Sequence, residues 1–281
     1  MPHLAVMRRG WQNEHLAAFM LSRMAFVAHP AKIGDDVGTD FFCTLFEVLT
    51  QEGNDYLVPR TSFAIQIKSS GTTIDATKQI EYLVRLELPF FVGIIDQEQS
   101  TLTIYSAEYL PVLFSYKGIP KSLTLELYPN HNFGPDSYFV DMGDNSYKLK
   151  CPIVSTLSVT MSLQTVAEES RRLREVASRI HGNIAARTSG EYVFNVGADG
   201  QTPLIMAGPG SVQVFRENFK KRLAEAFFNL IWIADNPNLR LDIDECRLYV
   251  QIYDNMRRRE NNLPPYLVHV AEELKRRLIS T

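Results

Sequence analysis

The sequence predicts an α/β protein, with a mixed sheet flanked by helices in residues 1–163 and a mainly helical domain in residues 164–281. Residues 90–95 form a short, wholly apolar run after a proline, which is typical of a central strand. In residues 63–68, large apolar side chains alternate with small or polar ones, as in a strand with two different faces. Beyond residue 164, apolar residues return at helical spacing, which indicates helices that pack along one stripe.

The elements of the first part follow from periodicity and from turn residues. We expect, in chain order, a helix over 11–28, strands over 41–49 and 61–69, a helix over 73–88, and strands over 90–95 and 101–105. Turn residues such as Gly53-Asn54-Asp55 separate the strands. Residues 111–163 are mostly extended and interrupted by prolines and glycines, which predicts further strands that complete the sheet.

The second part begins with a clear helix signal. Thr165-Val-Ala-Glu168 has the form of a capping box, in which the first and last side chains satisfy free backbone N–H groups at a helix start. Asp199-Gly200 predicts the turn of a hairpin. Three more helices are expected over 212–233, 243–259 and 265–279, the last opened by Pro264-Pro265.

Composition narrows the class of protein. Hydrophobic residues make up 45% and charged residues 22%, which is ordinary for a folded chain and excludes a disordered one. The net charge of −3 means that any surface for nucleic acid must be local. The apolar runs are too short to cross a bilayer, so no membrane is expected. Three distant cysteines, with no zinc spacing and no secretion signal, favour a cytoplasmic location.

Polar residues with chemical potential gather around the first two strands. On the second strand, alternation places Gln66 and Lys68 on one face, and Asp40 at the head of the first strand is the natural partner of the buried ammonium. Asp40, the side-chain oxygen of Gln66 and the backbone carbonyl of Ile67 are suitable ligands for a divalent cation. Lys68 would position water and stabilise charge on a phosphate, so the set predicts phosphodiester hydrolysis with Mg²⁺ or Mn²⁺.

Glu14 is a further candidate for this site. It lies on the same helical stripe as Ala17, Ala18 and Leu21, and a glutamate is rarely buried without a partner. The small residues would let the helix approach the sheet and bring a second carboxylate to the metal. The alternative is that Glu14 belongs to a frayed first turn and only favours the helix dipole.

Glu14, Asp36-x-Gly38-x-Asp40 and Gln66-Ile67-Lys68 together resemble the motifs of the PD-(D/E)xK, or restriction-endonuclease-like, nuclease superfamily. The resemblance is to the branch in which Gln replaces the acid before Lys, as in Mrr-like and Holliday-junction-resolvase-like nucleases of bacterial defence loci. It implies a restriction-endonuclease-like core, cleavage of DNA, catalytic Asp40, Gln66, Lys68 and Glu14, and a metal bound by Asp40, Gln66, Ile67 and Glu14. It also implies an effector role in defence against phages.

Other interpretations remain open at this point. Asp36 is a candidate ligand, although Asp-x-Gly also shapes turns. The chain is alternatively a non-catalytic nucleic-acid-binding or assembly subunit of a defence complex, or a nuclease that cuts RNA. The C-terminal helices are candidates for contacts with a partner subunit or a second copy. Their basic triplets, together with one in the preceding helix, are either solvated faces or a phosphate-binding track: Arg171/Arg172/Arg174, Lys220–Arg222, Arg257–Arg259 and Lys275–Arg277.

Overall fold

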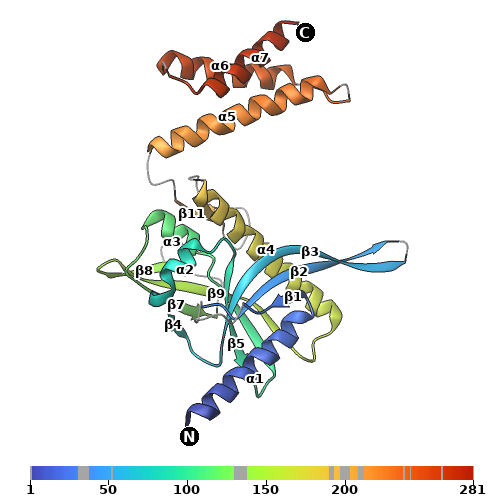
Figure 1. Cartoon of the computed structure of the whole chain (residues 1–281), viewed down its shortest axis with the longest axis vertical. Coiled ribbons are helices and arrows are strands. Elements are labelled where there is room, and N and C mark those ends of the chain that lie inside the picture. Colours follow the sequence, from blue (N-terminus) through green and yellow to red (C-terminus); the bar gives the residue numbers. More distant parts are fainter. Residues whose placement is uncertain are drawn as a thin grey trace. The chain divides into compact units, whose positions relative to one another are not determined.

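A mixed β-sheet organises the first part of the chain in the computed structural model (Figure 1). The structure describes residues 2–30, 38–51, 53–129, 138–189, 193–196, 203–207, 212–236, 238–240, 242–260 and 262–280. Two units divide the chain: the first comprises Met1–Thr188 and Tyr192–Gly208, and the second comprises Ser189–Glu191 and Pro209–Thr281. The protein is therefore α/β with a helical C-terminal region, as the sequence predicts.

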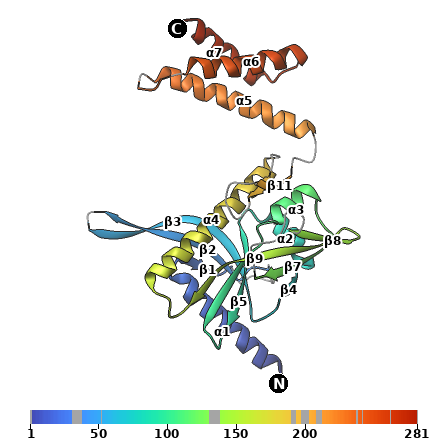
Figure 2. The same cartoon turned by 180° about the vertical axis from the view of Figure 1, so that it is seen from behind.

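The strands of the large sheet are β1 (Ala25–Ala28), β2 (Phe41–Gln51), β3 (Asn54–Lys68), β4 (Thr73–Asp75), β5 (Phe90–Asp96), β6 (Thr101–Ser106), β7 (Ser122–Tyr128), β8 (Phe139–Gly143) and β9 (Ser146–Ser158). Their order across the sheet is β1-β2-β3-β5-β6-β9-β7-β4, and β8 pairs with β9. β3 runs parallel to β5, and β7 runs parallel to β9, whereas the other pairs are antiparallel. The outer halves of β2 and β3 continue past the sheet as a two-stranded arm (Figures 1 and 2).

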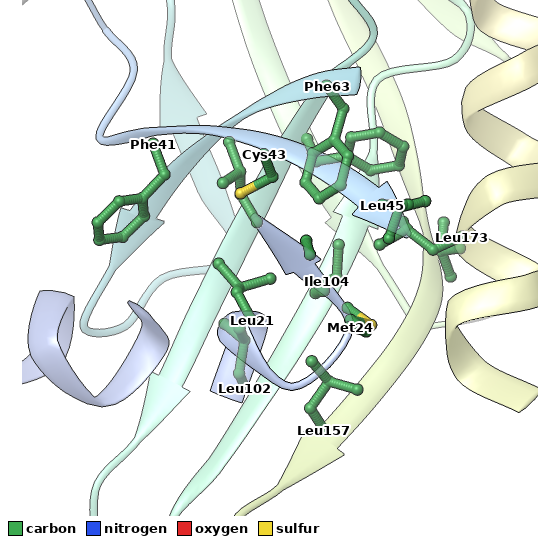
Figure 3. Close-up of a cluster of buried hydrophobic side chains, with 14 of the residues drawn as sticks. Leu21, Met24, Phe41, Cys43, Leu45, Phe63, Leu102, Ile104, Leu157 and Leu173 are labelled. Atoms are coloured by element: carbon green, nitrogen blue, oxygen red, sulfur yellow. The ribbon is translucent and has the colours of Figure 1, made fainter. Parts of the chain in front are cut away.

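One face of the sheet is covered by α1 (Pro2–Ser22) and α4 (Leu163–Thr188). Both helices contribute buried side chains to the same cluster as Phe63, Ile65 and Ile67 of β3. Figure 3 shows this cluster, with Leu21 from α1 and Leu173 from α4 among its members. The large apolar residues of β3 therefore face α1 and α4.

The other face of the sheet packs against η1 (Thr77–Gln79), α2 (Ile80–Arg85) and α3 (Leu110–Tyr116). Here Ile80 and Leu83 share a core with Ala64 of β3 and Val92 of β5. Since residues two apart on a strand share a face, the Ala64 face also carries Gln66 and Lys68. The sequence-predicted division of β3 into an apolar face and a face with the amide and ammonium is confirmed.

Several expected elements differ from the structure, and one of them is the strand expected over 61–69, which begins at Asn54 as β3. The helix expected over 11–28 ends at Ser22, because residues 25–28 pair with β2 as strand β1. The helix expected over 73–88 is β4, η1 and the short α2, because β4 pairs with β7 and the Asp75 carboxylate accepts a hydrogen bond from Thr77 N–H at 2.9 Å. The stretch expected to be extended contains α3, whose apolar side chains are buried.

The domain boundary expected between residues 163 and 164 lies inside the first unit. α4 buries Leu173, Ala177 and Ile180 against the sheet, so it belongs to that unit rather than to the helical one. The expected capping box is also shifted: the Ser162 hydroxyl accepts a hydrogen bond from Thr165 N–H at 3.2 Å, one turn earlier. β10 (Val193–Val196) and β11 (Pro203–Ala207) pair as expected, while Asp199-Gly200 lies outside the described residues.

The second unit contains α5 (Val212–Asp235), α6 (Ile243–Arg259) and α7 (Pro265–Ser280), close to the predicted bounds. Their cores meet around Phe227, Tyr253 and Leu274, which are fully buried. Asp242 caps α6, with its carboxylate accepting hydrogen bonds from two backbone N–H groups at 2.9 and 3.1 Å. Helical periodicity was sufficient to predict these three helices, although not the boundary of the unit that they form.

Candidate active site

Asp40 is fastened to the end of β3 by two hydrogen bonds. Its backbone N–H donates to the Ile65 carbonyl at 3.0 Å, and its carboxylate Oδ2 accepts from the Ile67 N–H at 2.5 Å. The Asp40 carboxylate thus accepts a hydrogen bond that a backbone carbonyl of an adjacent strand would otherwise accept. Because Phe41 pairs with Ile65, Asp40 lies at the register position of Gln66. The strand N–H groups lie in the plane of the sheet, so the Asp40 carboxylate lies at the strand end. The structure therefore places the Asp40 carboxylate against the main chain of Ile67 at the end of β3.

Ile67 directs its backbone toward Asp40. Ile65 and Ile67, two residues apart, both use main-chain groups on this side of β3, so the Ile67 carbonyl points past the start of β2. This is the direction required of the predicted main-chain ligand. Its side chain is buried among the apolar residues below α1.

Gln66 is a buried amide without a protein partner for its oxygen. Only 1% of the residue is exposed, and Oε1 has no hydrogen bond within the described part of the chain. An unsatisfied buried acceptor costs about 1–3 kcal/mol, so a bound group that approaches this oxygen would recover that cost. A ligand oxygen is the role that the sequence predicts for it.

Lys68 ends β3 on the same face as Gln66. It is half-buried, and among the described residues no carboxylate forms an ion pair with it. The expected salt bridge between Lys68 and Asp40 does not occur in the described part of the chain, and the Asp40 carboxylate instead accepts a hydrogen bond from the Ile67 N–H.

Glu14 lies on α1, which covers the face of the sheet opposite the one that carries Gln66 and Lys68. It is half-buried on the stripe of α1 that carries Ala17 and Leu21, both fully buried against the sheet. The preceding residue, Asn13, is 3% exposed and accepts a hydrogen bond from the Gln97 side chain at 2.5 Å. α1 begins at Pro2 and is packed at this point, so Glu14 does not belong to a frayed first turn. Its contact with a metal stays a prediction, and Asp36 lies outside the described residues.

The segment before Asp40 rests on the covering helices, a feature that sequence patterns did not reveal. The Thr39 hydroxyl and the Tyr82 hydroxyl are 2.7 Å apart, and Gly38 has a positive φ of 77°. A methyl group at Gly38 would lie 2.7 Å from Cδ of Gln79, so only glycine permits this approach. Gly38 was visible as part of the Asp-x-Gly-x-Asp pattern, whereas nothing in the sequence distinguishes Gln79 or Tyr82.

The set of oxygen donors suits a hard divalent cation. Asp40 supplies a carboxylate, Gln66 an unsatisfied amide oxygen and Ile67 a main-chain carbonyl, which are the ligand types of Mg²⁺ and Mn²⁺. No group of three or more His, Cys, Asp or Glu side chains that could hold a metal occurs in the described ranges. A cation at this site would therefore depend on the amide and carbonyl oxygens.

The cysteines do not offer an alternative nucleophile. Burial raises the pKa of the Cys43 thiol to about 12 and also raises the pKa of the Cys151 thiol, with nearby Glu108 and Glu126 adding to the effect on Cys151. Thiols with such pKa values are protonated near neutral pH, and only the thiolate is a nucleophile. Both residues belong to apolar cores.

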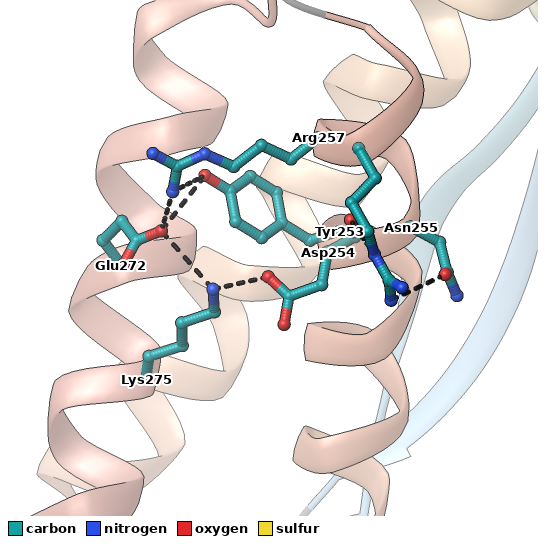
Figure 4. A network of polar contacts seen from close by, with 7 residues as sticks. Tyr253, Asp254, Asn255, Arg257, Glu272 and Lys275 are labelled. Atoms are coloured by element: carbon teal, nitrogen blue, oxygen red, sulfur yellow. Dashed lines mark hydrogen bonds and ion pairs between the residues drawn. The ribbon is translucent and has the colours of Figure 1, made fainter.

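The basic triplets of the second unit are largely neutralised within it. Arg257 contacts Glu272 at 2.6 Å, and Lys275 contacts Asp254 at 2.6 Å, in the network of Figure 4. Further ion pairs are Lys220–Glu260, Arg276–Glu273 and Arg277–Asp235. These contacts favour the solvated-face interpretation over a continuous phosphate-binding track.

Comparison of the chain with family models, curated proteins and solved structures finds no match. Within the described ranges, none of the helices has the length and apolar character needed to span a membrane. The functional interpretation accordingly rests on the geometry of the strand end that carries Asp40, Gln66 and Lys68.

Proposed function

We propose that the first unit is a divalent-metal-dependent nuclease with a restriction-endonuclease-like core that hydrolyses phosphodiester bonds of DNA. The observation that carries the proposal is the arrangement at the end of β3: the Asp40 carboxylate fixed on the Ile67 N–H, beside the buried and unsatisfied amide of Gln66. Lys68 follows on the same face without an ion pair in the described part of the chain. A set of oxygen acceptors next to a cationic side chain matches the needs of phosphate chemistry.

Asp40, Gln66 and the Ile67 carbonyl would hold Mg²⁺ or Mn²⁺, with Glu14 as a further ligand. A divalent cation at such a site supplies charge stabilisation for the phosphate and lowers the pKa of water. The protein contributes orientation: the hydrogen bond from Ile67 N–H keeps the Asp40 carboxylate in one direction. Lys68 would bind a phosphate oxygen or orient water through its ammonium.

The biological context and partners are part of the proposal. DNA as substrate and a role in bacterial defence against phages rest on the resemblance of the motifs, and RNA is the less favoured substrate. The second unit carries exposed large apolar side chains, including Phe228, Trp232 and Tyr266, which favour contacts with a partner subunit or a second copy.

The test is a cleavage assay with plasmid, linear and single-stranded DNA and with RNA, in Mg²⁺, Mn²⁺ or EDTA. Asp40→Asn keeps an acceptor for the Ile67 N–H but removes the charge, and Lys68→Met keeps the volume but removes the ammonium. We expect both to lower metal-dependent cleavage by about 100-fold or more. Lys121→Ala, on an exposed residue paired with Asp144, is the control and keeps wild-type rates. Cleavage in EDTA, or wild-type rates in both site variants, would overturn the proposal.

A second candidate is a non-catalytic nucleic-acid-binding or assembly subunit. The observation that favours it is Gln66, a neutral residue at a position where an acid would add negative charge to the metal site. The same assay separates the two functions. DNA binding by the wild-type chain without cleavage in either metal would select the binding subunit.

A further inference from the structure

Gln79 is the second glutamine near the strand end whose amide oxygen is buried and without a hydrogen bond in the described ranges. It ends η1, which lies over the sheet face that carries Gln66. The amide of Gln79 rests on Gly38, two residues before Asp40: its Cδ, Nε2 and Oε1 lie 2.7, 2.9 and 3.0 Å from the place of a Cβ on Gly38. A glutamine amide is thus held at the segment that leads into Asp40.

The backbone around Gln79 is firmly anchored. Gln79 N–H donates to the Ala76 carbonyl at 2.9 Å, and Ala76 N–H donates to the Leu123 carbonyl of β7 at 2.9 Å. One turn later, the Tyr82 hydroxyl lies 2.7 Å from the Thr39 hydroxyl. Burial raises the pKa of the Tyr82 phenol, which keeps its proton near neutral pH. The backbone that carries Gln79 is therefore held in place, while its buried amide oxygen has no hydrogen bond within the described ranges.

We propose that Gln79 is a positioning residue of the metal site, whose side-chain oxygen accepts a hydrogen bond from the hydration shell of the bound cation. This inference rests on the proposed function. Mg²⁺ keeps several of its waters in protein sites, and these waters are strong donors for a buried acceptor that lacks one. Groups that hold the ligands or waters of a metal typically change its affinity by 10–100-fold when they are removed.

The experiment measures Mn²⁺ binding to the full chain by isothermal titration calorimetry. Gln79→Met keeps the length of the side chain and removes the amide, and Gln79→Glu keeps an acceptor at the same place. We expect the dissociation constant for Mn²⁺ to rise at least 10-fold in Gln79→Met and to stay within a few-fold of wild type in Gln79→Glu. Gln99→Leu is the matched control, because Gln99 is an exposed residue of the β5–β6 turn. We expect this variant to leave the dissociation constant for Mn²⁺ unchanged.

Thermal melts without metal separate positioning from a merely structural role. If Gln79 only packs against Gly38, Gln79→Met lowers the melting temperature of the metal-free protein and leaves the affinity for Mn²⁺ unchanged. This outcome overturns the inference. If the buried acceptor serves the cation, the metal-free variant is as stable as wild type or more so, because an unsatisfied group has been removed. Should Gln79→Met not fold, Gln79→Leu provides the same comparison.

Wild-type protein that binds neither Mn²⁺ nor Mg²⁺ overturns the proposed function and this inference together. Equal metal binding by the wild type and both apolar variants overturns the inference alone.

Discussion

At the scale of single residues, the candidate site holds two buried amide oxygens without a hydrogen bond among the described residues, a property that the buried Ser106 and Ser155 hydroxyls of the sheet share. Gln66 and Gln79 keep buried amide oxygens without hydrogen bonds in the described ranges, while the neighbouring carboxylate of Asp40 is held by a main-chain N–H. Buried polar atoms are nearly always paired in folded proteins, so each exception needs an explanation, and two such amides beside a fixed carboxylate are explained by a bound ion. This is the physical basis for placing the metal site here.

Glu14 provides the first residue-scale prediction. If it reaches the metal, it adds a second negative charge near Asp40 in the metal-free protein, and like charges in a partly desolvated site oppose folding. Glu14→Gln should therefore be at least as stable as wild type without metal. Metal at 100 times its dissociation constant should stabilise the wild type by about 2.7 kcal/mol and the variant by clearly less. Thermal melts of the wild type and Glu14→Gln, with and without Mn²⁺, measure both stabilities. A destabilised variant with an unaltered metal-induced shift would remove Glu14 from the site.

Cys43 provides a prediction about alkaline stability. Burial raises the pKa of its thiol from 9.0 to about 12, so the folded state keeps a proton that the unfolded chain releases above pH 9. The stabilising contribution is complete below pH 9 and is lost as the pH rises toward 12, at roughly 1.4 kcal/mol for each pH unit. Urea unfolding at pH 8, 9.5 and 10.5 should show a shallower decline for Cys43→Val than for wild type. Equal slopes would contradict the assignment.

At the scale of elements, the role of α4 is to close the face of the sheet opposite Gln66. Its apolar stripe enters the cluster of Figure 3, where Leu173 is fully buried. The same helix joins the β2–β3 arm through Arg174, which lies 3.5 Å from Glu47, and Glu47 also pairs with Arg60 at 2.7 Å. These pairs are partly exposed and contribute little, so the helix is held mainly by apolar burial.

Leu173→Ala should lower the free energy of unfolding of the first unit by about 2–5 kcal/mol, because it removes a buried side chain and leaves a cavity. Arg171→Ala, on an exposed residue of the same helix, should change it by less than about 0.5 kcal/mol. Urea denaturation followed by circular dichroism measures both. If the two variants were equally stable, α4 would not be part of this core.

At the scale of the whole molecule, the chain has two units with separate apolar cores. The first contains the sheet, its flanking helices and the β10–β11 hairpin, and the second contains α5, α6 and α7. The candidate site belongs entirely to the first unit, since Glu14, Asp40, Gln66, Lys68 and Gln79 precede residue 188. The second unit contributes none of these residues.

Two fragments test this division. Residues 1–208 should unfold cooperatively and bind Mn²⁺ with the affinity of the full chain, because they keep the whole of the first unit. Residues 1–163 should fail to fold, because loss of α4 exposes the apolar face of the sheet. Circular dichroism and calorimetry provide the measurements. A stable, metal-binding fragment 1–163 would restore the boundary that sequence patterns suggested.

Much of the fold could be predicted where local signals agree. β2, β5, β6 and the three C-terminal helices follow the expected ranges, because alternation and helical periodicity are properties of adjacent residues. β3 ends as expected but begins at Asn54 rather than at residue 61. The helix predictions were wrong for residues 25–28 and 73–75, which form strands. These residues pair with β2 and β7, and both partners are distant in the sequence. Tertiary pairing overrode local preference there.

The sequence by itself determined the α/β class, the two faces of β3 and the presence of Asp40, Gln66, Ile67 and Lys68 at neighbouring strand ends. Spacing along a strand is enough for that, because the side-chain repeat is two residues. Only the tertiary structure decided that the Ile67 N–H holds the Asp40 carboxylate, that α4 belongs to the sheet and that Gln79 rests on Gly38. Each of these depends on which backbone and side-chain groups are satisfied after packing, and contacts between distant segments set that outcome.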